Sequence, residues 1–225
     1  MSKPHLVYFA DPMCSWCWGF SPVIEAIQQR YGPALPIRLI VGGLRPWTTA
    51  PITAHERADI RQHWEHVRDA SGQPFDFTFF DRAGFVYDTE PASRAIVVLR
   101  RRGRETGLAA LRRIQRAFYA ENRDVTDTGT LTALAVELGM EAKAFRNDFE
   151  SEAAAAETRA DFAIAQSAGV RGFPTLITGK GRDGRHALVT HGFQPGAQIL
   201  PALAQWLGTA AGEGTRPDEE DSVDF

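Results

Sequence analysis

Cysteine is scarce in this chain: its 225 residues include only two, Cys14 and Cys17. A structural zinc site needs four ligands, yet there is no third cysteine, and no histidine follows the pair before His55. The scarcity therefore argues against a zinc site built on the two thiols. His63 and His66 lie three residues apart within an expected helix. A metal-binding module therefore stays an alternative function.

Long apolar runs are also missing. A transmembrane helix needs about eighteen or more consecutive apolar residues, and the sequence has no such run, so we expect no membrane-spanning segment and no membrane partner. Residues 1–4 lead almost directly into the first expected strand, which leaves no room for a signal peptide. We therefore expect a cytoplasmic protein, in which a disulfide is usually transient and catalytic rather than structural.

Charge is distributed unevenly along the chain, whose net charge is −3. Residues 213–225 carry six acidic side chains against one basic side chain, Arg216. A polar, acidic segment of this kind has too little apolar surface to form a core. We therefore expect residues 209–225 to be a disordered acidic tail.

A basic stretch in the middle of the chain has the opposite charge. Surfaces that bind single-stranded nucleic acid combine basic groups with aromatic side chains, and no aromatic residue interleaves with these arginines. We interpret the stretch as a solvated face of two helices and expect no nucleic-acid partner. The arginines are Arg100, Arg101, Arg102, Arg104, Arg112, Arg113 and Arg116.

The two cysteines lie at a junction between two patterns. Leu6–Ala10 is a short apolar run that predicts a buried strand. Residues 17–31 have apolar side chains at helical spacing, Pro22 suits the start of a helix, and Gly32 follows the last turn. The pair is therefore expected at a helix N-terminus, where the helix dipole stabilises a thiolate.

This location predicts different roles for the two thiols. Cys14 lies at the mouth of the helix and is the expected nucleophile, whereas Cys17 lies one turn in and is expected to be more covered. Cys17 can then resolve a mixed disulfide formed on Cys14. Two ordinary buried core cysteines are the alternative, because free cysteine is often simply core.

The rest of the chain predicts an α/β fold. Apolar runs predict strands at residues 37–41, 175–178 and 187–190, the last two forming a hairpin through a turn at 179–184. Residues 52–168 are mostly helical in pattern, apart from a phenylalanine-rich packed loop at 73–85, and a helix at 198–207 closes the chain. We expect a mixed sheet of about four strands with a large all-helical insertion, divided as residues 1–48 with 169–208 and residues 49–168.

Three segments carry a resemblance to a known family. They are DPMCSWCWGF at residues 11–20, GVRGFPTL at 169–176 and TEPASRA at 89–95. In these motifs the chain resembles the DsbA-like thioredoxin-fold proteins, and more narrowly the cytoplasmic branch of FrnE-like proteins and predicted protein-disulfide isomerases. The resemblance covers nearly all of residues 5–208.

The resemblance implies a cis-proline at Pro174, facing the cysteine pair, with the Phe173 backbone available to an extended substrate. A trans-proline that merely starts a strand is the alternative. Trp16 and Trp18 flank Cys17 and are expected to form an apolar rim that either contacts substrate or packs. The dipeptide between the cysteines is Ser15-Trp16, rather than the Pro-His or Gly-Pro of better-known relatives. Because this dipeptide tunes the reduction potential of the pair, the sequence does not fix that potential.

The expected function is that of a thiol–disulfide oxidoreductase of the protein disulfide reductase or isomerase type. Its cofactor is the redox-active pair alone, its substrates are protein or small-molecule disulfides, and glutathione or a thioredoxin-type protein is the electron donor. Asp11 is either a proton shuttle for Cys17 or a helix cap. The alternative is a glutathione-dependent isomerase or transferase of the kappa-class or hydroxychromene-carboxylate type, although those relatives carry serine at the position of Cys14.

Overall fold

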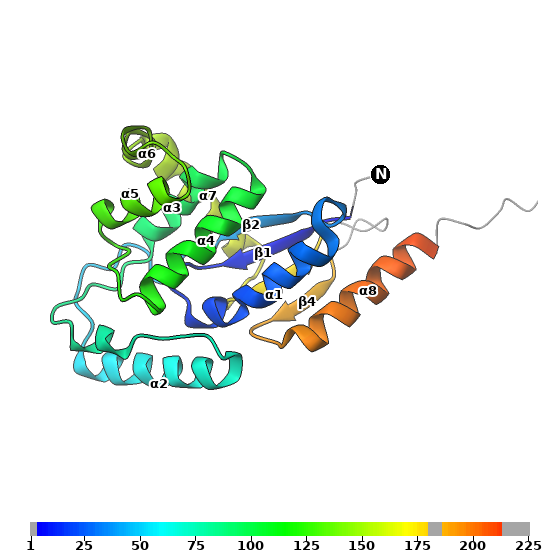
Figure 1. The fold of residues 1–225 in the computed structure, drawn as a ribbon, viewed down its shortest axis with the longest axis horizontal. Helices are drawn as coiled ribbons and strands as arrows, with labels where there is room; N and C mark the ends of the chain where they lie inside the picture. Colours follow the sequence, from blue (N-terminus) through cyan, green and yellow to red (C-terminus); the bar gives the residue numbers. More distant parts are fainter. Residues whose placement is uncertain (1–3, 180–185, 213–225) are drawn as a thin grey trace, which may run out of the picture.

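The computed structural model describes residues 4–179 and 186–212 (Figure 1). Its centre is a four-stranded mixed sheet with the order β2-β1-β3-β4. The strands are β1 (Leu6–Ala10), β2 (Ile37–Val41), β3 (Thr175–Thr178) and β4 (Leu188–His191). The predicted fold class is confirmed, and each strand lies within one residue of its predicted place.

Strand β1 is the centre of the arrangement. It pairs in parallel with β2 and antiparallel with β3, while β3 and β4 form the predicted antiparallel hairpin. Most of the predicted hairpin turn lies outside the described residues. Both ends of the chain therefore contribute to one sheet, and the helical block is inserted between them (Figure 1).

Helices cover both faces of β1, which is why all five of its residues are buried and apolar. Leu6 and Tyr8 face helix α1 (Ser15–Tyr31), while Val7 and Phe9 pack with Ala165 of helix α7 (Glu152–Ser167). Helix α7 belongs to the predicted insertion, yet it covers the second face of the sheet. The predicted domain division stays a prediction.

The remaining helices form the block on the left of Figure 1, apart from α8, which lies beside β4. Asp127 caps α5, with its side chain accepting a hydrogen bond from the Thr130 N–H. The elements are η1 (Gly32–Ala34), α2 (Ala54–Ser71), η2 (Phe77–Asp81), α3 (Glu90–Arg100), α4 (Arg104–Tyr119), α5 (Thr128–Glu137), α6 (Ala142–Phe149) and α8 (Gly196–Gly212).

An aromatic cluster around Trp64 holds the phenylalanine-rich segment. The Trp64 ring centroid lies 4.9 Å from those of Phe79, Phe80 and Tyr119, and 5.7 Å from that of Phe118. Such ring pairs stabilise a core beyond the area that they bury. The segment is packed as predicted, but part of it forms the short 3₁₀ helix η2 rather than a loop.

Two expectations about the ends of elements need correction. Helix α8 continues to Gly212, so residues 209–212 are helical and do not begin a tail. Residues 213–225, the acidic part of the predicted tail, lie outside the described residues. Within residues 4–179 and 186–212, no helix has both the length and the apolar character that crossing a bilayer requires.

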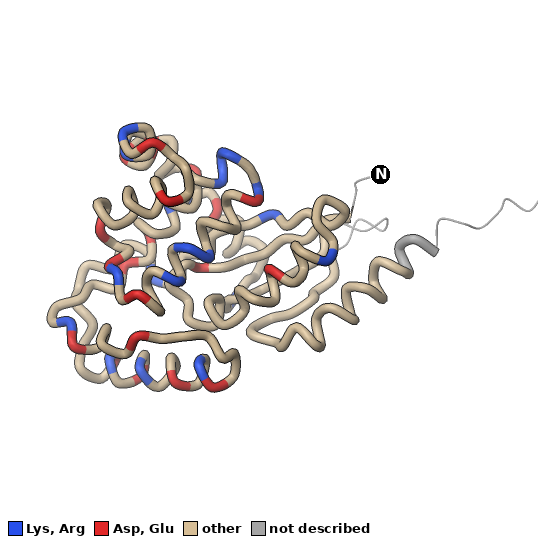
Figure 2. The backbone as a smooth tube through the Cα atoms, viewed as in Figure 1, with Lys and Arg blue, Asp and Glu red and all other residues tan. Residues whose placement is uncertain are grey.

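The basic stretch is less solvated than predicted. Blue segments lie along α4 in Figure 2, but the side chains of Arg100 and Arg113 are only 17% and 21% exposed. Arg100 pairs with Asp161 and Glu157. These ion pairs neutralise much of the basic charge, and the expected lack of a nucleic-acid partner stays a prediction.

Candidate active site

The turn after β1 places Cys14 at the N-terminus of α1. The Cys14 N–H donates to the Asp11 carbonyl (3.2 Å), and the Trp18 N–H donates to the Cys14 carbonyl (3.1 Å). Cys14 is the N-cap residue, no side chain caps the helix, and its first turn has no acidic residue. The free N–H groups and the dipole of α1 are therefore available to a negative charge on Cys14.

The two thiols are free and lie against each other. Cys17 is fully buried, whereas Cys14 keeps 7% of its surface exposed. Burial raises the pKa of Cys17 well above its usual value, and a hydrogen bond with Cys14 raises it further. This arrangement matches the expectation that Cys17 is the more covered partner, and at neutral pH it holds Cys17 as a thiol.

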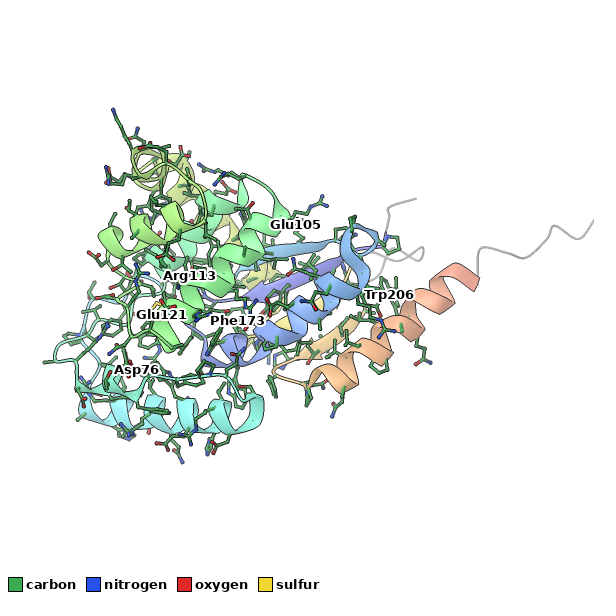
Figure 3. The ribbon with its side chains drawn as sticks, viewed as in Figure 1. Asp76, Glu105, Arg113, Glu121, Phe173 and Trp206 are labelled. Carbon is green, nitrogen blue, oxygen red and sulfur yellow. The ribbon has the colours of Figure 1, made fainter. Side chains whose placement is uncertain are left out.

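The loop that precedes β3 lies beside the thiols, although it is far from them in the sequence. The Phe173–Pro174 peptide bond is cis, as the resemblance implies. The Cys14 thiol donates to the Phe173 carbonyl across 3.5 Å, and the Pro174 carbonyl accepts a hydrogen bond from Gly192. Residues 159 positions apart thus meet at one site, and Figure 3 marks Phe173.

The Phe173 ring is packed against a glycine after β2. A Cβ atom built on Gly42 would lie 2.0 Å from Cζ and 2.8 Å from Cε2 of Phe173. Only a glycine leaves room for the ring there, because both contacts are far shorter than van der Waals separation. The absence of a side chain at Gly42 therefore helps to position Phe173 beside Cys14.

Replacing Gly42 with alanine is expected to lower the free energy of unfolding by about 1–3 kcal/mol, because the ring must move in a packed core. The displaced Phe173 carbonyl should also change the rate at which Cys14 is alkylated. Urea unfolding and timed alkylation measure both effects. Gly208→Ala is the matched control, since nothing lies within 4 Å of a Cβ there. Equal stabilities for the two variants would contradict the packing role of Gly42.

Asp11 is fully buried and accepts two backbone hydrogen bonds. Its Oδ1 accepts from the Met13 N–H (2.8 Å) and its Oδ2 accepts from the Leu44 N–H (2.7 Å). Burial raises the pKa of Asp11 to about 6 in spite of these bonds. The prediction that Asp11 caps the helix is wrong, because its carboxylate ties the loop after β2 to the cysteine turn instead.

The buried carboxylate predicts a pH dependence of stability. The pKa of Asp11 is higher in the folded state than in the unfolded chain, so its contribution to stability falls as pH rises from about 4 to beyond 6. Between pH 5 and pH 7 the loss is about 1 kcal/mol. Relative to Asp11→Asn, the wild-type protein should lose this amount of unfolding free energy in urea titrations.

Asp76→Asn is the control for this comparison. Hydrogen bonds from Thr78 lower the pKa of Asp76, so this exposed carboxylate stays ionised across the window. Its stability difference from wild type should therefore be the same at pH 5 and pH 7. If the unfolding free energies of Asp11→Asn and wild type also differed by the same amount at pH 5 and pH 7, Asp11 would not titrate in this range.

Loop residues of the insertion hold the cysteine turn from the side. The Tyr87 hydroxyl donates to the Met13 carbonyl (2.7 Å), and the Trp18 Nε1–H donates to the Pro74 carbonyl (3.0 Å). Trp18 is only 2% exposed, which favours packing, one of the two roles expected for it, and its contact with substrate stays a prediction. Trp16 is partly exposed and packs on Phe193, with ring centroids 5.5 Å apart.

No group of three or more histidine, cysteine or acidic side chains that could hold a metal lies within the part of the chain that the structure describes. His63 and His66 are both exposed on the surface of α2. The chemistry that this geometry offers is therefore that of two adjacent thiols, a buried carboxylate and a nearby peptide carbonyl.

Comparison with known proteins agrees with this geometry. The sequence profile of the DsbA-like thioredoxin domain matches residues 5–208. The chain belongs to this family. The narrower assignment to the FrnE-like branch stays a prediction, although structural neighbours of this DsbA-like chain include cytosolic disulfide reductases.

Two solved structures of other proteins are similar to this DsbA-like chain in both sequence and fold. A candidate protein disulfide isomerase from Nitrosomonas europaea is 39% identical, with a TM-score of 0.84, over 92% of this chain and 99% of that one. The cytosolic disulfide reductase DsbM from Pseudomonas aeruginosa is 29% identical, with a TM-score of 0.73, over 93% of this chain and 99% of that one. DsbM has also been solved with glutathione.

A more distant relative carries a different description. The ClpXP adapter protein SpxH from Halalkalibacterium halodurans is 29% identical over 180 residues, which are 78% of this chain and 58% of that protein. The DsbA-like chain therefore spans less than two thirds of the length of this curated relative.

The loop that Asp11 anchors carries exposed apolar residues that the sequence did not suggest. Leu44 and Trp47 are 42% and 58% exposed on the loop that Asp11 anchors. Trp47 has a φ of 60°, which is uncommon for an aromatic residue, and its ring lies 5.7 Å from that of Phe162. Phe162 in turn lies under Gly43. No periodicity marks these residues in the sequence, because the loop takes its place only through tertiary contacts.

Proposed function

We propose that this DsbA-like chain is a thiol–disulfide oxidoreductase of the disulfide reductase or isomerase type. The observation that carries the proposal is the contact between a slightly exposed Cys14 at a helix N-terminus and a buried Cys17, beside the Phe173 carbonyl. A structural disulfide or an inert core pair would need neither the uncapped helix N-terminus nor the nearby backbone acceptor.

The proposed reaction is two successive thiol–disulfide exchanges. The Cys14 thiolate attacks one sulfur of a substrate disulfide and forms a mixed disulfide, while the other substrate sulfur leaves as a thiolate. The Cys17 thiolate then attacks Cys14 Sγ and releases the second substrate sulfur. The substrate gains two electrons, and the protein is left with a Cys14–Cys17 disulfide.

The second exchange needs a base, because Cys17 is held as a thiol. Asp11 is buried near Cys17, and its negative charge raises the pKa of Cys17 further. With its own pKa raised to about 6, the Asp11 carboxylate is ionised at neutral pH and basic enough to take the proton. We therefore assign Asp11 the role of proton shuttle.

The oxidised pair must be reduced again, and a small thiol can supply the electrons. Two molecules of glutathione supply the two electrons and leave as glutathione disulfide. The glutathione-bound structure of DsbM supports this donor, and a cytoplasmic location supplies it. Partly exposed Trp16, Phe173 and Trp47 provide apolar surface for a disulfide-bearing client.

The test is reduction of a disulfide-bonded peptide with glutathione as the donor, followed as peptide thiols appear. Wild type should turn over, and each single cysteine-to-serine variant should not. The same variants are then assayed for conjugation of glutathione to an electrophile. Conjugation that survives loss of either thiol, without peptide reduction by wild type, would favour the glutathione transferase alternative.

A further inference from the structure

Strand β2 is an edge strand of the described sheet, and two side chains of the helical insertion bind its outer edge. The Asp161 carboxylate of α7 accepts a hydrogen bond from the Val41 N–H (2.9 Å). Arg100 of α3 donates to the Leu39 carbonyl (3.1 Å). These two backbone groups, on residues two apart, are ones that a further strand would bind, so the side chains take the place of that strand.

The two side chains also bind each other. Both Nη1 and Nη2 of Arg100 donate to the Asp161 carboxylate, and Nη2 donates to Glu157 as well (3.0 Å). Helices α3 and α7 both pack against β2 (Figure 1), and Asp161 is buried between them. A buried carboxylate needs such partners to offset the cost of leaving water. The ion pair therefore fixes the Asp161 side chain at the end of β2.

Val41, which Asp161 binds, is the first residue of a short segment that leads toward the thiols. The next residue, Gly42, donates its N–H to the Ala10 carbonyl (2.8 Å). Gly42 also makes the close contact with the ring of Phe173, whose carbonyl accepts a hydrogen bond from the nucleophilic thiol. The end of β2 is thus one residue away from a group that lies beside the redox pair.

The far end of this segment binds the buried carboxylate of the site. Leu44 donates its N–H to Asp11 Oδ2 (2.7 Å). Between the two ends, Gly43 lies against the ring of Phe162 on α7, since a Cβ atom built on Gly43 would lie 2.9 Å from that ring. Each of residues 41–44 is therefore tied to a fixed partner. A displacement at the β2 end of the segment has to be passed on to Leu44.

We propose that Asp161, held in place by Arg100, is a positioning residue for the redox site. It fixes the end of β2 and so determines, through the segment that follows, how closely Leu44 approaches Asp11. This role rests on the proposed function, since Asp11 is the proton shuttle of the second exchange, but it is tested without turnover. Absence of turnover in the wild type would refute the function alone, whereas an unchanged Asp11 titration would refute this role alone.

The ionisation of Asp11 reports on the approach of Leu44. Burial raises the pKa of Asp11, and the hydrogen bond from Leu44 lowers it. A longer bond from Leu44 should therefore raise this pKa further. None of the variants used below replaces a titratable group that interacts with the Asp11 charge. Those groups are Cys17 of α1, Tyr87 and Asp88 of the loop before α3, and Tyr119 of α4.

The test follows the titration of the Asp11 carboxylate by NMR in the reduced full-length protein, grown with isotope-labelled aspartate. Asp161→Asn replaces one acceptor oxygen with a donor, and Arg100→Lys removes the fork that binds both oxygens. In both variants we expect the acid dissociation constant of Asp11 to fall at least about threefold. Phe162→Leu removes the ring beside Gly43 and leaves the ion pair in place. It should move the titration in the same direction, which keeps the test decisive if the ion-pair variants do not fold.

Arg94→Lys is the matched control. Arg94 also lies on α3, pairs with Glu90 and donates to the Phe149 carbonyl (3.3 Å), but these contacts lead to α6 and not to β2. Its replacement should lower the urea midpoint, as Arg100→Lys does, and leave the Asp11 titration as in the wild type.

Two results would overturn the proposal. One is a wild-type titration of Asp11 in every folded variant of Asp161, Arg100 and Phe162. The other is an equal shift of the Asp11 titration in Arg94→Lys, which would show a general effect of lost stability rather than a specific effect of the end of β2.

Discussion

Replacing Cys14 with serine should abolish disulfide reduction, with a loss of turnover of at least about a thousandfold. A serine hydroxyl is not ionised at neutral pH and cannot form the mixed disulfide, so the first exchange has no nucleophile. The replacement removes one sulfur from a small pocket and keeps the helix N-terminus intact. Release of peptide thiols under saturating glutathione measures the loss.

The control for this variant is its stability. The Cys14 thiol donates a hydrogen bond to the Phe173 carbonyl, and a serine can donate to the same atom. The thermal midpoint of Cys14→Ser should therefore stay close to that of wild type. A folded Cys14→Ser protein with wild-type turnover would show that Cys14 is not the nucleophile.

Replacing Cys17 with serine should stop the reaction halfway. Cys14 still attacks the substrate, but no second thiol exists in the chain to resolve the product. A mixed disulfide between Cys14 and the peptide should accumulate in one-to-one stoichiometry. Non-reducing electrophoresis and mass spectrometry of the tryptic peptides locate the bond.

The matched control is Cys14→Ser under the same conditions. Its only remaining thiol, Cys17, is fully buried and has a pKa raised by burial, so it should form no adduct within the time that traps Cys17→Ser completely. Adducts on Cys17 at a comparable rate would reverse the two roles.

The sheet and the helix after the cysteines could be predicted from sequence because local signals define them. Leu6–Ala10 is a continuous apolar run, as a strand buried on both faces requires. Asp127 precedes a helix whose N–H groups it can cap. In both cases the residues that determine the element lie within it or next to it.

The site could be predicted only in part, because most of its contacts join distant residues. Trp18 was expected either to contact substrate or to pack, and the sequence could not show that its indole donates to Pro74, 56 residues away. Asp11 was expected to act locally if it capped the helix, whereas its carboxylate accepts from Leu44. No local signal marks the role of Gly42, since its contact with Phe173 needs the complete sheet.

A cavity between α1 and α4, whose lining includes Tyr8, Arg113 and Gln115, shows the same limit. The arginines of α4 suggest a solvated face when they are counted along the sequence. In the fold, Arg113 is mostly buried and Gln115 points inward beside Tyr8 of β1. A polar residue on the buried face of a helix can be recognised only once the neighbouring elements are placed.

Equilibration in a series of glutathione redox buffers, followed by rapid alkylation and mass spectrometry, tests most directly whether the pair cycles. The account predicts one two-electron transition, from a protein with two alkylated cysteines to a protein with none and an intramolecular Cys14–Cys17 bond. Two alkylated cysteines at every buffer ratio, or a lasting glutathione adduct without that bond, would contradict it.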